Sequence, residues 1–140
     1  MSMPDDLSNC LVLNTVLAAR TLLRRGDAKL KPFGITVQQF SLLAVVRFYP
    51  GEPVTSLAPR VFLDRTSLTR NLDLLEHKGL VRRTPGAAGN QRLCELTKRG
   101  DLLLDQLLPE WQRSQSELMK GISLQDAESY LRVARRFSQR

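Results

Sequence analysis

The sequence predicts a mainly α-helical fold with one small β-hairpin, and three observations support that prediction. Apolar residues recur at helical spacing over long stretches at both ends of the chain. Between these stretches, short amphipathic segments precede two strand-like runs joined by a Pro- and Gly-containing tip. The 140 residues, 42% of them hydrophobic, are enough to bury one core, so we expect one domain with helical extensions.

The composition also excludes several classes of protein. No apolar run approaches the roughly 18 residues that a membrane span requires, and the first residues lack the pattern of a secretory signal. Two cysteines are too few for a disulfide framework. We therefore expect a soluble, cytoplasmic protein.

The first half of the chain reads as three helices. A long first helix runs from about Leu7 to Lys29 and ends at the Lys-Pro-Phe-Gly run 31–34. Thr36 and Gln39 form a capping box that starts a second helix over 37–48. The residues of this second helix that we expect to face inward are Phe40, Leu43, Ala44 and Phe48. After a turn at 49–53, Thr55 opens a short third helix.

The second half begins with a turn at Phe62 and Leu63, where Phe62 is expected to plug the core. Asp64 caps a fourth helix over 65–78, which stops at Gly79. Strands are expected at 80–84 and 91–96, with a hairpin tip at 85–90. Thr97 caps a long fifth helix, kinked at Pro109 and broken at Gly121. Ser123 caps a last helix with an apolar stripe formed by Leu124, Ala127, Leu131, Ala134 and Phe137.

Positive charge is concentrated in one region of the chain. Residues 60–99 hold nine Lys or Arg against four acids, a local net charge of +5. Residues 1–59 carry a net +2, and residues 100–140 carry none. A local basic surface is what binding to a polyanion requires.

The fourth helix has two distinct faces. Leu68, Leu72 and Leu75 share a buried side by their spacing. The residues that project from the other sides are Arg65, Thr66, Thr69, Arg70 and Asp73. Arginine can bond guanine edges in the major groove, and threonine can contact phosphate or a thymine methyl. A solvated amphipathic helix is the alternative, but the preceding short helix and tight turn form a helix-turn-helix, and the hairpin and the charge favour DNA reading.

Several runs of the chain resemble the MarR-type winged-helix transcriptional regulators. The matching segments are 34–40 (GITVQQF), 57–58 (LA), 64–72 (DRTSLTRNL), 75–81 (LEHKGLV) and 96–100 (LTKRG). The resemblance implies an N-terminal dimerisation helix at 1–33, a winged helix-turn-helix at 34–97 and C-terminal dimerisation helices at 98–140. It also implies a homodimer on a near-palindromic double-stranded operator, and repression relieved by a small-molecule effector or an oxidant.

The hairpin tip departs from the family pattern. The family usually has Asp-x-Arg there, with the Arg in the minor groove, whereas this chain has Ala88, Gly89 and Asn90. Arg92 lies two residues further on and is a partial substitute. The fourth helix is therefore expected to carry more of the binding than the wing.

These arguments give a set of candidate DNA-binding residues. The base and phosphate readers are Arg65, Thr66, Ser67, Thr69 and Arg70. Thr55 and Ser56 are expected to hold backbone phosphate through hydroxyl and amide donors. Asn90 and Arg92 are the wing candidates.

A few single residues have two interpretations. Cys10, at the start of the first helix, is either a reactive thiol, as in members of the family that sense peroxide, or a small apolar residue at the dimer seam. Cys94 is interpreted as buried filler. Phe33, Phe40 and Trp111 either line a ligand pocket between the dimerisation helices and the winged helix or pack in the core.

Nothing in the sequence assembles an enzyme. His77 is the only histidine and has no metal-type spacing of ligands around it, so we expect no metal and no cofactor. A nucleophile elbow and a glycine-rich phosphate loop are missing. Two alternatives to a DNA-binding regulator stay open: a redox sensor that acts through Cys10 with DNA binding as its output, and a helical dimerisation module without a nucleic-acid role.

Overall fold

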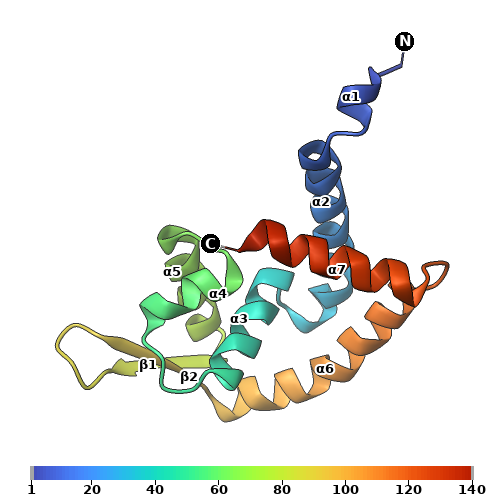
Figure 1. The fold of residues 1–140 in the computed structure, drawn as a ribbon. Coiled ribbons are helices and arrows are strands. Elements are labelled where there is room, and N and C mark those ends of the chain that lie inside the picture. Colours follow the sequence, from blue (N-terminus) through green and yellow to red (C-terminus); the bar gives the residue numbers. More distant parts are fainter. Residues whose placement is uncertain (1, 140) are drawn as a thin grey trace. The chain divides into compact units, whose positions relative to one another are not determined.

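The computed structural model describes residues 2–139, which form two compact units divided between Asp101 and Leu102 (Figure 1). The elements in chain order are α1 (Asp5–Ser8), α2 (Leu11–Leu30), η1 (Lys31–Phe33), α3 (Val37–Phe48), η2 (Val54–Ser56), α4 (Leu57–Val61), α5 (Arg65–His77), β1 (Val81–Pro85), β2 (Arg92–Leu96), α6 (Lys98–Leu118) and α7 (Leu124–Ser138). The helix α6 starts in the first unit and continues into the second. The predicted fold class, mainly α with a small hairpin, is confirmed.

The first predicted helix is interrupted near its start. Helix α1 ends at Ser8 and α2 begins after Cys10, whose backbone is extended. The Asn14 amide donates hydrogen bonds to the carbonyls of Ser8 (2.9 Å) and Cys10 (2.8 Å). The break has a physical reason, because such side-chain bonds to the backbone offer it an alternative to the helical pattern.

Helix α3 lies at the centre of the first unit. Its predicted capping box is present: the Gln39 amide donates to Thr36 Oγ1 (3.2 Å), and the Thr36 amide donates to Gln39 Oε1 (3.3 Å). Leu42 and Leu43 are completely buried. The expectation that Phe48 faces inward is wrong, since its side chain is 62% exposed. Five residues after Leu43, Phe48 is turned by roughly 140° from the buried row.

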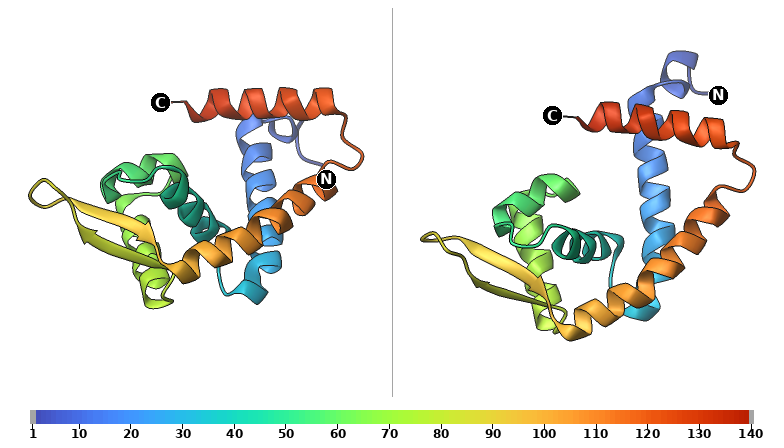
Figure 2. Two further views of the ribbon diagram at one scale, coloured as in Figure 1. Left: turned by 90° about the horizontal axis from the view of Figure 1, so that it is seen from below. Right: turned by 60° about the horizontal axis from the view of Figure 1, so that its bottom comes forward.

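The hairpin projects as a two-stranded antiparallel ribbon (Figure 2). Its register pairs Val81 with Leu96 at the base and Pro85 with Arg92 near the tip. An isolated bridge between Pro53 and Leu93 adds a third segment beside β2, which no pattern in the sequence predicted. The segment before η2 is therefore joined to the hairpin.

Hydrogen bonds hold the base of the hairpin against the start of α6. The Thr97 hydroxyl donates to the Gly79 carbonyl (2.6 Å), and the Thr97 amide donates to the Leu80 carbonyl (3.1 Å). A Cβ atom at Gly100 would lie 2.0 Å from the Leu80 carbonyl oxygen. Only glycine allows this close approach of α6 to the backbone.

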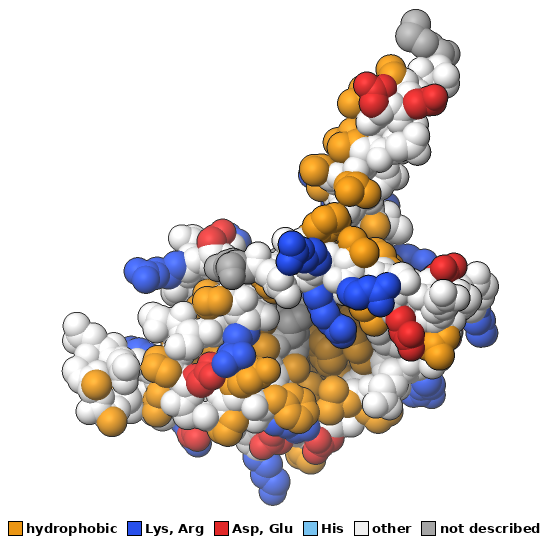
Figure 3. All heavy atoms as spheres, viewed as in Figure 1, with side chains coloured by type: hydrophobic (Ala, Val, Ile, Leu, Met, Phe, Trp, Pro, Cys, Tyr) orange, Lys and Arg blue, Asp and Glu red, His pale blue; other side chains and the backbone are white. Residues whose placement is uncertain are grey.

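Long apolar faces stay uncovered in both units. In the first unit, Leu11, Val12 and Leu17 of α2 are exposed, and Figure 3 shows hydrophobic side chains gathered along the arm formed by α1 and α2. In the second unit, Ser123 caps α7 by accepting the Asp126 amide, and the predicted apolar stripe of α7 exposes Leu124. None of the helices between residues 2 and 139 is long and apolar enough to cross a membrane.

Candidate nucleic-acid interface

Helix α5 is set in place by its cap and its leucine face. Asp64 Oδ1 accepts the Ser67 amide (2.7 Å), and this bond to the charged form holds the pKa of the Asp64 carboxyl below its ordinary value. Leu68, Leu72 and Leu75 are buried, as their spacing predicts. The helix is thus held along one side, and its other side is turned outward.

A buried polar pair, missed in the sequence, fixes α5 against α3. The side chain of Asn71 is only 7% exposed, and its Oδ1 accepts a hydrogen bond from Gln39 Nε2 (3.3 Å). Asn71 Nδ2 donates to the Ser67 carbonyl (2.9 Å). Buried polar groups need such partners, so the pair fixes the rotation of α5 about its axis. Its position within the leucine row was the signal that the sequence offered.

The outward side of α5 lines an open hollow of about 810 Å³. The lining residues are Arg65, Thr66, Thr69, Arg70, Asp73, Leu74 and His77. Among the described residues, the guanidinium groups of Arg65 and Arg70 have no hydrogen-bond or ion-pair partner; Arg70 exerts only a longer-range attraction on Asp64. The first two turns of α5 therefore present two available cations and two threonines to solvent.

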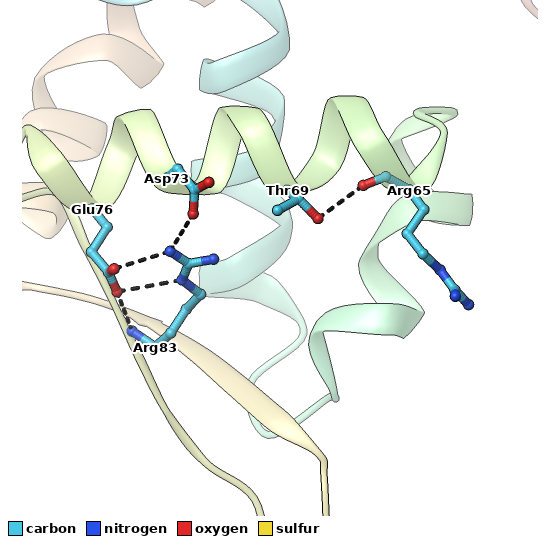
Figure 4. Close-up of polar contacts among 5 residues, drawn as sticks. All are labelled: Arg65, Thr69, Asp73, Glu76 and Arg83. Carbon is cyan, nitrogen blue, oxygen red and sulfur yellow. Dashed lines mark hydrogen bonds and ion pairs between the residues drawn. The ribbon is translucent and has the colours of Figure 1, made fainter.

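The second half of α5 is different, because its acids hold an arginine of the hairpin. Arg83 Nη2 lies 2.5 Å from Asp73 Oδ1 and 3.0 Å from Glu76 Oε1 (Figure 4). The Arg83 amide also donates to Glu76 Oε2 (3.1 Å). These bonds lower the pKa of Glu76 below its ordinary value and raise that of Arg83. The contacts tie β1 to α5 at a fixed place.

Other basic residues of the charged region are also paired. Arg60 Nη2 lies 2.7 Å from Glu52 Oε1, with the guanidinium over the Tyr49 ring, and Arg82 Nη2 lies 2.6 Å from Glu95 Oε1. The net charge counted for residues 60–99 includes all nine Lys and Arg, but the ion pairs of Arg60, Arg82 and Arg83 neutralise part of this positive charge. Arg65 and Arg70 at the start of α5 are among the cations that stay without an ion pair in the described residues.

Three other predicted contact residues lie close to the start of a helix. Ser67 is half-buried, and its amide donates to the Asp64 carboxylate, so it serves the cap of α5. Thr55 and Ser56 are exposed in η2, just before α4. The Ser56 amide already donates to the Pro53 carbonyl (2.9 Å), so only its hydroxyl, and not the predicted amide, is available to a phosphate.

The tip of the wing is exposed and uncharged. It is closed by a hydrogen bond from the Gly86 amide to the Gln91 carbonyl (2.7 Å), and Asn90 lies within it. Arg92 is exposed at the start of β2 and pairs with Pro85, two residues along from the Arg83 and Cys94 pair. Cross-strand pairs two residues apart share a face, so Arg92 lies on the α5 side of the ribbon. Its charge contributes to the lowered pKa of Glu76.

The two cysteines differ in environment. Cys10 is half-buried, at the residue that precedes α2. Cys94 is buried, and burial raises the pKa of its thiol to about 11, which keeps it protonated and unreactive. The interpretation of Cys94 as filler agrees with this environment.

The ligand pocket expected at Phe33, Phe40 and Trp111 stays a prediction. Phe40 is buried in the core of the first unit, Phe33 and Trp111 are each half-buried in their own units, and none lines the α5 hollow. A second hollow, of about 400 Å³ beside the α2–α3 turn, contains none of them either.

The expectation that Phe62 plugs the core is wrong: it is 58% exposed, with a φ of 53° at the turn before α5. Phe62 is the left-handed residue that follows the last turn of α4, the position at which many helices end.

An exposed, partly cationic helix behind a short helix and beside a paired hairpin defines the winged helix-turn-helix class. The model of the MarR family matches residues 35–100. The chain is 35% identical to the transcriptional regulator MosR of M. tuberculosis, solved in complex with DNA, with 94% of this chain and 95% of that chain covered and a TM-score of 0.82.

Two further relatives are more distant. A mutant of MarR from E. coli, complexed with operator DNA, is 24% identical, with 97% and 99% of the chains covered and a TM-score of 0.86, and it supports the fold. YwoH of Bacillus subtilis, an uncharacterised HTH-type transcriptional regulator, is 24% identical over 122 residues, covering 87% of this chain and 89% of its own. The chain belongs to the MarR family of transcriptional regulators.

Proposed function

We propose that this protein binds double-stranded DNA through the first two turns of α5 and regulates transcription from the bound site. The observation that carries the proposal is the exposed set Arg65, Thr66, Thr69 and Arg70 on a helix whose opposite face is buried. Arginine and threonine on an exposed helix suit the major groove, where Arg bonds guanine and Thr contacts phosphate or thymine. That MosR was solved with DNA supports the same use here.

The binding form is a homodimer on a near-palindromic operator. The uncovered apolar faces of α2 and α7 support this part of the proposal, because a monomer gains little by exposing them to water. Two copies related by a two-fold axis present two α5 helices, and half-sites one helical turn apart, or a multiple of it, match that symmetry.

We further propose that the protein represses transcription, and that a small ligand or an oxidant relieves this repression by releasing the protein from DNA. Cys10 is the candidate for oxidation, because a residue that precedes a helix lies at its positive end. If peroxide acts there, it weakens DNA binding of the wild type but not of Cys10→Ser. A protein with this role belongs in the cytoplasm and has no enzymatic activity.

The test is an unbiased selection of duplexes from random DNA. We expect recovery of an inverted repeat, bound with a log–log salt slope of about −0.9 for each neutralised phosphate. A helical dimerisation module without a nucleic-acid role predicts no enriched sequence, and binding that is weak and independent of salt.

A further inference from the structure

We propose that Thr69 is a specificity-determining residue which recognises a thymine through its methyl group, while its hydroxyl donates no hydrogen bond to a DNA phosphate. The inference rests on the proposed DNA binding by α5. Threonine can contact a phosphate through its hydroxyl or a base through its methyl group, and we expect Thr69 to make the second contact.

The hydroxyl of Thr69 is already engaged. Its Oγ1 donates a hydrogen bond of 3.0 Å to the backbone carbonyl of Arg65, one turn earlier (Figure 4). A hydroxyl has a single proton to donate, and a phosphate oxygen only accepts. A phosphate contact would therefore require this bond to break, whereas the methyl branch of the exposed side chain is available without any change.

The neighbours of Thr69 suit a base contact. Arg65 and Arg70 line the same hollow of α5, and Arg bonds the acceptors of guanine in the major groove. Thymine presents a C5-methyl group in that groove, and this is the feature an apolar atom can distinguish from cytosine. Thr69 thus presents a methyl group on the same outward side of α5 as two arginines, so we expect it to distinguish a thymine close to guanines.

Thr66 provides a matched contrast on the same helix. It lies three residues earlier, is exposed and lines the same hollow. Among the described residues its hydroxyl has no hydrogen-bond partner, so its proton is available to a phosphate. The two threonines are therefore expected to use opposite branches of the same side chain.

The test combines substitutions in the protein with the removal of single methyl groups from DNA. Thr69→Val keeps a methyl and removes the hydroxyl, Thr69→Ser does the reverse, and Thr66→Val is the control. Valine, serine and threonine have similar helix propensities, and thermal unfolding verifies that the variants fold alike. Each protein is titrated at fixed salt with the duplex recovered from the random selection, in which each thymine is replaced in turn by deoxyuridine.

The expected result is one thymine in each half-site where deoxyuridine weakens wild-type binding about fourfold, the effect of burying one methyl group. Thr69→Val keeps this sensitivity and wild-type affinity. Thr69→Ser binds both duplexes equally, and Thr66→Val weakens binding to every duplex alike. The proposal is overturned if Thr69→Val loses affinity as Thr66→Val does, or if Thr69→Ser stays sensitive to the methyl.

The two proposals fail in different ways. A selection that enriches no duplex overturns the proposed function and this inference together. An enriched duplex without a thymine in its half-sites, or one whose deoxyuridine scan is flat for the wild type, overturns the role of Thr69 alone and leaves DNA binding by α5 in place.

Discussion

The two halves of α5 use charge in opposite ways. The first half exposes Arg65 and Arg70 without an ion-pair partner among residues 2–139, whereas the second half uses Asp73 and Glu76 to hold Arg83 of the hairpin. Both halves contain charged residues on an exposed helix. A count of cations therefore does not define a binding surface, because ion-pair partners decide which cations are available to a ligand.

Loss of an arginine without an ion-pair partner should weaken DNA binding the most. Arg70→Ala is expected to cost about 1–3 kcal/mol of binding free energy on the selected duplex, as for a lost bidentate contact. The matched control is Arg82→Ala, which removes the same charge from an exposed pair with Glu95. Fluorescence anisotropy at fixed salt measures the DNA affinity of both variants. Equal losses of affinity would show that available and paired arginines do not differ in their contribution to binding.

The next effect concerns the base that fixes the hairpin beside α5. Gly100→Ala is expected to lower the free energy of unfolding by about 2 kcal/mol, because its Cβ would meet the Leu80 carbonyl oxygen and overpacking costs 1–3 kcal/mol. Urea unfolding measures the change. Gly121→Ala is a poor control because Gly121 has a positive φ, so Ala88→Gly at the exposed tip is the better one. A neutral Gly100→Ala would show that this close approach is not needed.

A smaller effect tests the paired half directly. Arg83→Gln removes the cation that Asp73 and Glu76 share, and it is expected to cost about 1 kcal/mol of unfolding free energy, the upper range for partly exposed pairs. It also leaves two acids uncompensated near the DNA-facing hollow, so affinity should fall as well. Arg82→Gln is the control, on the same strand. Unchanged DNA binding in Arg83→Gln would show that the contacts of Arg83 with Asp73 and Glu76 are not needed for DNA binding.

The smallest effect is a dependence of stability on pH. The pKa of Glu76 is lowered in the fold from its ordinary value of 4.5 by its hydrogen bonds with Arg83. The stability that this carboxylate contributes is therefore present above pH 4.5 and is lost as the pH falls through its folded pKa. Between neutral and acidic pH, thermal unfolding of Glu76→Gln should change less than that of the wild type. Parallel curves would contradict the pairing.

Much of the fold follows from local sequence patterns. The Thr36 and Gln39 box, the Asp64 cap and the leucine row of α5 all act within one or two helical turns, so spacing alone predicts them. The break before α2 was not predicted, because it depends on how the Asn14 side chain bonds two nearby carbonyls.

The candidate site was predicted only in part. Which residues of α5 point outward follows from helix periodicity, and the structure agrees with it. Helix periodicity does not predict which arginines are free of ion pairs. Glu52, Glu95 and Asp73 pair with arginines that only the folding of the turn, the hairpin and the α5–β1 packing brings close. The buried Asn71 and Gln39 pair joins residues 32 positions apart, and only tertiary structure reveals it.

The role of the first two turns of α5 is decided by the salt dependence of binding of the double variant Arg65→Ala/Arg70→Ala to the selected duplex. We predict an affinity reduced by about a hundredfold or more and a log–log slope shallower than that of the wild type, with thermal unfolding unchanged. Wild-type affinity and slope in a folded double variant would contradict the assignment of DNA binding to the first two turns of α5.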